Sequence, residues 1–230
     1  MKRFYAEVTL AAGPDGHALL LDGRPVRTPG GRPLTAPDAR LGAAAAAEWR
    51  VQGERIDPAT MPVTRFLNSL VDRVCGREAA VVEEILAYGP TDLLCYRAEG
   101  PESLVRREAE TRDPPLAWIA RTHGVHLATA TGIRPRPQDK AVLDALRRAV
   151  ERHDACHLIA LHDATRLAGS VVLGLALVER ALDRAAFWRA AMLEEERQRE
   201  QWGEDPEAER RLQILSRELD EIVAWLGLIG

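Results

Sequence analysis

The 230-residue sequence predicts an α+β fold: a small N-terminal, mostly antiparallel β domain with helices, followed by a larger all-α domain. Two observations predict it. The first 35 residues alternate apolar and polar positions between turn sequences, which is typical of a small antiparallel sheet. Most of the later chain has apolar residues at helical spacing, interrupted by proline and glycine. We place the domains at residues 1–85 and 86–230.

Short strands and tight turns are predicted for the N-terminal region. Asp22-Gly23 lies between two apolar runs, and this pair is typical of a two-residue hairpin turn. Gly13 to Gly16 and Gly30 to Pro33 are further turn sequences. The expected strands lie at residues 3–10, 17–21, 24–27 and 34–35.

Helices are predicted for most of the chain after residue 37. The expected helices span residues 37–49, 64–74, 77–88, 101–110, 116–122, 140–153, 170–179, 183–200 and 206–226. Residues 154–163 are ambiguous. The segment 170–179 is apolar on every side, so we expect it at the centre of a helical bundle.

The composition is that of an ordinary soluble globular protein, with 46% hydrophobic residues, 29% charged residues and a net charge of −4. A negative protein lacks the basic surface that nucleic-acid binding needs. Three widely spaced cysteines form neither a disulfide framework nor a zinc motif, and they fit a reducing compartment. The start of the chain has no targeting character, and no apolar run is long enough to span a bilayer. We therefore expect no nucleic-acid partner and no membrane insertion.

Two features depart from the ordinary composition. Five of the eleven aromatic residues are tryptophan. Residues 193–221 contain eleven acidic residues and five arginines, a net charge of −6, which exceeds the charge of the whole chain. This acidic segment is the main electrostatic landmark of the sequence.

The sequence contains no convincing catalytic motif. It has no phosphate-binding glycine loop and no nucleophile elbow. His153 and His157 are spaced to share a helix face, but too few converging ligands accompany them for a metal site. The three consecutive glutamates at 194–196 could supply carboxylates for acid–base chemistry, yet neighbouring helix positions point about 100° apart. We expect no catalytic residue and no metal.

Motifs that mix aromatic, proline, glycine and charged residues follow one another along nearly the whole chain. They are Arg3-Phe4-Tyr5, residues 21–29, Glu48-Trp49, Gln52, residues 61–64, Asn68, residues 91–97, Asp113-Pro114, Trp118, Gly132-Ile133, Gly169-Ser170, residues 194–198, Trp202-Gly203 and Glu207-Ala208. In this order they resemble the Atp12 family, the assembly chaperones of the F₁ sector of ATP synthase. One departure is Arg112, which stands where a tryptophan usually precedes the Asp-Pro pair.

The resemblance implies a non-catalytic chaperone. Such a protein binds the free alpha subunit of F₁ and prevents its aggregation before it assembles with the beta subunit. The resemblance also implies an α+β domain joined to a helical domain, no cofactor, and action in the bacterial cytoplasm or, for eukaryotic members, in the mitochondrial matrix. Since no transit segment is visible, we expect the bacterial case. We also expect a monomer when the protein is free.

The acidic segment with its tryptophan is our candidate for the partner-binding surface. An acidic residue in this segment is important in the family, and Glu195 is the best match to it. The expected partner-binding residues are Glu194, Glu195, Glu196, Gln198 and Trp202. The expected supporting residues are Trp49, Asp92, Arg97 and Asp113. Trp49 has an alternative interpretation, packing in the core between a helix and the sheet.

Two other functions stay open from the sequence. One is a metal- or carboxylate-dependent hydrolase that would use Glu195, Glu196, His153 and His157. The other is a general protein-binding scaffold built on the same fold.

Overall fold

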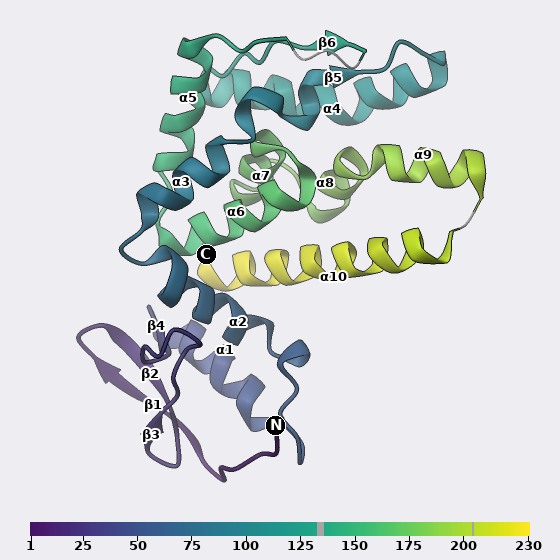
Figure 1. Cartoon of the computed structure of the whole chain (residues 1–230). Helices are drawn as coiled ribbons and strands as arrows, with labels where there is room; N and C mark the ends of the chain where they lie inside the picture. Colours follow the sequence, from purple (N-terminus) through teal and green to yellow (C-terminus); the bar gives the residue numbers. More distant parts are fainter. Residues whose placement is uncertain (133–135, 204) are drawn as a thin grey trace. The chain divides into compact units, whose positions relative to one another are not determined.

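The computed structural model describes residues 1–132, 136–203 and 205–230, which form two compact units (Figure 1). Unit 1 comprises Met1–Glu78 and Ala224–Gly230, and unit 2 comprises Ala79–Val223. Ile133, part of one of the sequence motifs, lies outside the described residues. The small N-terminal antiparallel sheet and the largely helical C-terminal part confirm the predicted fold class. The domain boundary after residue 85 stays a prediction, because a compact unit is not by itself an independently folding domain.

Four short strands of unit 1 form one antiparallel sheet. They are β1 (Val8–Gly13), β2 (Gly16–Leu21), β3 (Arg24–Pro25) and β4 (Thr35–Ala36), and β2 pairs with each of the other three. The predicted hairpin is confirmed: Leu21 pairs with Arg24 across Asp22-Gly23. Both turn residues have positive φ, 47° and 75°, as the hairpin turn requires.

The first strand begins later than the sequence predicts, at Val8 instead of residue 3. The side chain of Asp22 accounts for the difference. Its carboxylate accepts hydrogen bonds from the backbone N–H groups of Ala6 and Glu7, at 3.1 and 2.8 Å. These donors are therefore not available for a ladder with a neighbouring strand.

Two helices complete most of unit 1. Helix α1 (Ala39–Arg50) begins at Asp38, whose side chain accepts from the N–H of Leu41. The buried alanines of α1 let it pack closely against β1 and β2. Helix α2 (Pro62–Ser69) continues into a π-helical turn at Leu70–Val74.

The carboxylate of Glu48 in α1 holds the start of α2. It accepts from the N–H groups of Val63 and Thr64, at 2.7 and 2.8 Å, and from the Thr64 hydroxyl at 2.7 Å. Gln52 binds the intervening loop, because its amide oxygen accepts from the N–H of Asp57 at 2.8 Å. Glu48 and Gln52, both from the sequence motifs, thus stabilise the connection between α1 and α2 in unit 1.

Helices dominate the chain from residue 78 onward. The elements are α3 (Glu78–Leu86), 3₁₀ turns at Gly89–Thr91 and Leu93–Cys95, β5 (Tyr96–Arg97), α4 (Glu102–His123), β6 (Ala130–Thr131), α5 (Lys140–Glu151), α6 (Ala155–Ala168), α7 (Val171–Val178), α8 (Arg184–Ala191), α9 (Leu193–Trp202) and α10 (Pro206–Ile229). β5 and β6 form a short parallel pair that the sequence did not predict.

Helix α7 lies at the centre of unit 2, as predicted for the apolar segment 170–179. All eight of its residues are buried, and it packs against α4, α6 and α8 (Figure 1). Residues 154–163, which were ambiguous, belong to α6. Asp154 begins that helix by accepting from the N–H of His157.

Two predictions about helix boundaries are wrong. The predicted helices at 101–110 and 116–122 are one helix, α4, which runs through Pro114 and Pro115. An internal proline costs about 3 kcal/mol. The tertiary packing of α4 against α5, α7 and α8 keeps it continuous despite the prolines. Its buried residues are spaced three or four apart along one face: Leu104, Glu108, Arg112, Pro115 and Ile119.

The predicted helix at 183–200 is divided into α8 and α9 at Met192. Met192 has φ −104° and ψ 18°, which is outside the helical range, and this interrupts the helix. Met192 and Leu193 are both buried at the break.

Candidate partner-binding site

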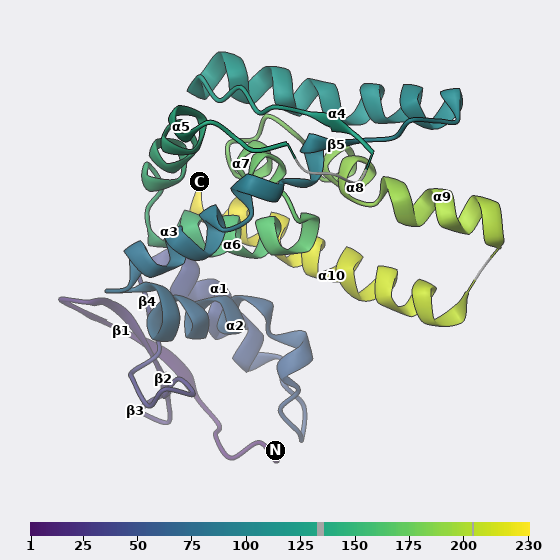
Figure 2. The same ribbon diagram turned by 45° about the horizontal axis from the view of Figure 1, so that its top comes forward.

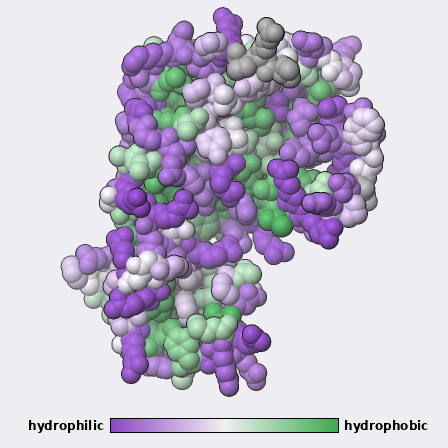
Figure 3. Space-filling model, viewed as in Figure 1, coloured by the Kyte–Doolittle hydropathy of each residue, from purple (hydrophilic) through white to green (hydrophobic). Residues whose placement is uncertain are grey.

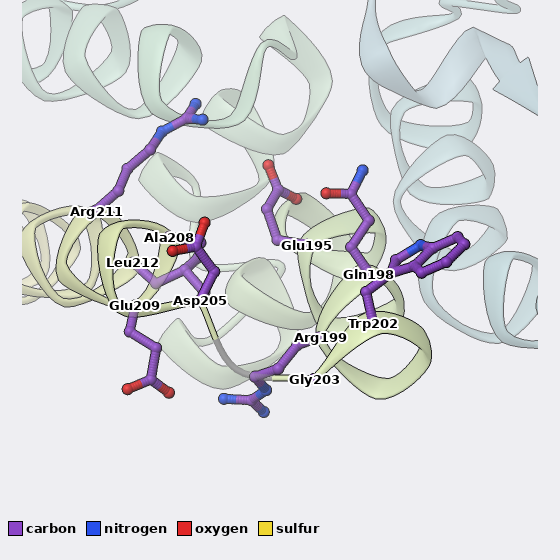
Figure 4. A pocket seen from close by; sticks show the side chains of 10 residues that line it. All are labelled: Glu195, Gln198, Arg199, Trp202, Gly203, Asp205, Ala208, Glu209, Arg211 and Leu212. Carbon is purple, nitrogen blue, oxygen red and sulfur yellow. The ribbon is translucent and has the colours of Figure 1, made fainter.

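Helices α9 and α10 border a cleft that contains part of the predicted site. Figures 1 and 2 show α9 and the first turns of α10 running in opposite directions beside each other. The cleft between them has a volume of about 380 Å³, and a space-filling view shows the surface hollowed there (Figure 3). Its lining residues are Glu195, Gln198, Arg199, Trp202, Gly203, Asp205, Ala208, Glu209, Arg211 and Leu212 (Figure 4).

Three of the five predicted partner-binding residues lie on one face of α9. Glu195, Gln198 and Trp202 are three and four positions apart, the spacing of neighbours along a helix face. Figure 4 shows the side chains of Glu195 and Gln198 pointing the same way. The Trp202 side chain is 78% exposed, an unusual state for an indole. The face therefore combines a carboxylate, an amide and a large apolar surface.

The three consecutive glutamates of α9 differ in their ion pairs. Glu194 accepts from Nε of Arg197 at 3.2 Å, and Glu196 lies 3.6 Å from Nη2 of Arg107 in α4. Glu195 has no ion pair with any residue that the structure describes. It is only half-buried and lines the cleft. Of the three carboxylates, that of Glu195 is therefore the one available to a partner.

Arg107 ties α9 to α4. Its Nη1 donates to the carboxylate of Glu200 at 2.6 Å, while Nη2 faces Glu196. The hydrogen bond with Glu200 raises the pKa of Arg107 further above its usual value. Glu196 and Glu200 are four positions apart, so Arg107 neutralises one side of α9 and leaves the side with Glu195 free.

Two predicted supporting residues, Arg97 and Asp113, bind each other. Nη2 of Arg97 donates to the Asp113 carboxylate at 2.6 Å, and Nη1 donates to the backbone oxygen of Glu108 at 3.3 Å. Arg97 is in β5 and Asp113 is in α4, so the pair joins these two elements. Arg97 also lines a second cavity, of about 630 Å³, together with Glu194 and Arg197.

Arg112 is a residue that sequence reasoning noted as a departure but did not place. It is 2% exposed, and its Nη1 donates to Glu108 at 2.7 Å. Nε and Nη2 are buried without a hydrogen-bond partner among the described residues. Burial lowers its pKa, and the carboxylates of Glu108, Glu194 and Glu195 oppose that effect in this order, with Arg97 adding to the lowering. Arg112 shares a three- and four-residue spacing with the other buried positions of α4, and this spacing could have indicated from the sequence that Arg112 is buried.

The other two supporting residues lie away from the α9 face. Trp49 is buried in unit 1, where its ring lies 5.6 Å from the Tyr5 ring and its backbone oxygen accepts from the Tyr5 hydroxyl at 2.7 Å. This is the core packing that was the alternative interpretation. Its position in a family motif therefore has a structural explanation.

Asp92 is fully buried and organises the centre of unit 2. Its carboxylate accepts from the N–H of Leu94 at 3.0 Å and from that of Val172 at 3.2 Å. The Ser170 hydroxyl also bonds to it. Burial raises the pKa of Asp92 to about 6 against the lowering effect of these hydrogen bonds. Asp92 thus holds the start of α7 in place.

The histidines considered for a metal site bind carboxylates instead. Nε2 of His153 lies 3.7 Å from Glu179, and Nδ1 of His157 lies 2.8 Å from Asp154. Within residues 1–132, 136–203 and 205–230, no group of three or more histidine, cysteine or acidic side chains is arranged to hold a metal ion. In the same part of the chain, no helix has both the length and the apolar character needed to cross a membrane.

Comparisons with known proteins agree on one family. Residues 2–120 match the family model described as ATP12 chaperone protein. The crystal structure of Atp12 from Paracoccus denitrificans is 40% identical, with a TM-score of 0.94, and the match covers 100% of this chain and 98% of that one. An aspartate-to-lysine variant of the same protein matches with a TM-score of 0.93. The Atu1473 protein of Agrobacterium tumefaciens is 37% identical, with a TM-score of 0.91 over 100% of this chain and 86% of that one.

Proposed function

The chain belongs to the ATP12 chaperone family, whose members assist ATP synthase assembly, and we propose that it binds the free alpha subunit of the F₁ sector. In this proposal it shields the alpha subunit from aggregation until the beta subunit takes its place. The observation that carries the proposed site is the Glu195 carboxylate, which forms no ion pair with a described residue and lies on the same face of α9 as the exposed Trp202, on a segment that resembles the family's.

The physical character of the α9 face supports a reversible complex. A subunit chaperone has to cover an apolar interface and then release it, which favours a modest contact area with polar groups at its edge. Trp202 offers apolar area, while Gln198 and Glu195 offer hydrogen-bonding groups next to it. We propose that Glu195, Gln198 and Trp202 contact the partner directly. Glu194 and Glu196, the other two residues expected at this site, are paired with Arg197 and Arg107 and would contribute negative charge beside it.

The family and its solved members are named as chaperones, which suggests a protein without catalytic activity. We propose that the chain is not an enzyme, needs no cofactor and is a monomer when free. Its proposed place of action is the bacterial cytoplasm, or the mitochondrial matrix for a eukaryotic source. Trp49, Asp92, Arg97 and Asp113 would support the fold around the site.

Co-purification tests the proposal. The tagged full chain is expressed with the alpha subunit of its own organism, and the retained alpha subunit is quantified. Glu195→Lys should weaken the complex by about tenfold or more, because it reverses a charge at the contact. Glu151→Lys is the matched control, since Glu151 is an exposed residue of α5 outside the cleft. It should leave the complex unchanged.

Three results would count against the proposal. Absence of any complex with the alpha subunit would remove the proposed partner. Capture of many unrelated proteins would favour a general scaffold. Stoichiometric metal in the purified protein would revive the hydrolase.

A further inference from the structure

We propose that the cleft between α9 and α10 receives a basic segment of the partner, in which apolar side chains flank an arginine or lysine directed at Glu195. This inference rests on the proposed function for the identity of the partner, but it concerns the chemistry of the segment that docks. That chemistry is inferred from the cleft and from the charge of the segment that forms it.

The state of the Glu195 carboxylate is the first reason. It is unpaired among the described residues and half-buried at the wall of the cleft. A partner that fills the cleft removes water from this charge, and an unpaired charge is costly to desolvate. Docking is therefore favourable only when the partner brings a positive group to Glu195.

Among the described residues, no cation forms an ion pair with Glu195. Arg112 of α4 is attracted electrostatically to Glu195, but its guanidinium is buried and paired with Glu108. Arg107 is bound to Glu200, and Arg197 is bound to Glu194 and Gln201. Arg199 lines the cleft, but Figure 4 shows its side chain pointing away from Glu195, to the side where Glu209 also points. The side chain of Arg211 ends on the same side of the cleft as the Glu195 carboxylate (Figure 4), but the two form no ion pair in the part of the chain that the structure describes. The missing positive charge has to come from outside.

The apolar part of the cleft is the second reason. Trp202 is 78% exposed, and Leu212 and Ala208 of α10 contribute apolar surface to the opposite wall. Apolar side chains that flank the cation would cover this surface. The face of the Trp202 indole can in addition attract a guanidinium group.

The charge of the surrounding segment is the third reason. Residues 193–221 have a net charge of −6. Their field attracts positively charged segments and repels acidic ones before contact. The attraction should weaken as the salt concentration rises.

Peptide binding tests the inference. Short overlapping peptides that together span the alpha subunit are immobilised and probed with the full chain, with its Glu195→Gln and Trp202→Ala variants, and with Glu151→Gln as the control. The retained peptides should contain arginine or lysine next to apolar residues. Glu195→Gln and a peptide in which neutral citrulline replaces the arginine should each weaken binding by about tenfold. Glu151→Gln should bind as the parent chain does.

Several outcomes would overturn the inference. They are retained peptides without a basic residue, unchanged binding by Glu195→Gln, an intact alpha subunit that binds while no peptide does, and a concentration-dependent dimer that Trp202→Ala abolishes. A chain that retains basic peptides but does not bind the intact alpha subunit would instead disprove the proposed partner and leave the chemistry of the cleft supported.

Discussion

The buried ion pair between Arg112 and Glu108 allows a sharp prediction about stability. The side chains of Arg112 and Glu108 are 2% and 4% exposed to solvent, and Nη1 of Arg112 lies 2.7 Å from Oε1 of Glu108. Arg112→Met would leave the Glu108 carboxylate buried without its counter-charge. Removal of one partner from a buried pair costs about 3–5 kcal/mol.

The cost should fall near the lower end of that range. Nε and Nη2 of Arg112 have no hydrogen-bond partner in the described part of the chain, so methionine also removes two unsatisfied buried donors. The other oxygen of Glu108 still accepts from the N–H of Ala98 at 2.8 Å. We therefore expect Arg112→Met to lower the free energy of unfolding by about 3 kcal/mol.

A second variant isolates the charge. Glu108→Gln combined with Arg112→Met removes both charges and keeps an acceptor for Ala98. The double variant should recover most of the loss and lie within about 1 kcal/mol of the parent. Urea unfolding of the full chain, followed by far-ultraviolet circular dichroism, measures both values. A single variant as stable as the parent, or a double variant less stable than the single one, would refute the reasoning.

Four further outcomes can be measured on single variants. Asp92→Ala should lower the free energy of unfolding by about 1–3 kcal/mol, because the N–H groups of Leu94 and Val172 lose their acceptor. Since burial raises the pKa of Asp92 to about 6, the folded chain holds this proton more tightly than the unfolded chain. Its contribution to stability should therefore fall as pH rises from about 4 through about 6, and Asp92→Asn should remove that slope. Glu48→Ala should cost about 1–2 kcal/mol through the lost cap of α2, measured by urea unfolding. Trp202→Ala should weaken alpha-subunit binding without a change in melting temperature, whereas Val51→Ala, at an equally exposed position, should change neither.

Local features of the fold could be predicted from the sequence. The Asp22-Gly23 turn and the Asp38 and Asp154 helix starts depend on contacts within a few residues. The apolar segment of α7 requires burial wherever it lies. Such features follow from short-range geometry and hydrophobicity.

Features that depend on distant partners could not be predicted. α4 continues through Pro114 because its other residues pack against the rest of unit 2. The parallel pair of β5 and β6 joins segments separated by the whole of α4. Neither the packing of α4 nor the pairing of β5 with β6 produces a pattern in the local sequence.

The candidate site shows the same division. The acidic composition of α9 and its tryptophan are visible in the sequence, but the difference between the three glutamates is not. Glu196 has its partner in Arg107, which is in another helix, while Glu194 pairs within α9. Only the three-dimensional arrangement therefore distinguishes Glu195.

The most direct test of the account is the affinity of the purified full chain for the alpha subunit of its own organism, measured side by side for the parent, Glu195→Lys and Glu151→Lys. The account predicts a complex with the parent and the Glu151 variant, and a loss of affinity of about tenfold or more for the Glu195 variant, with all three chains equally folded. Equal affinity of the three chains, or no complex with any of them, would contradict it.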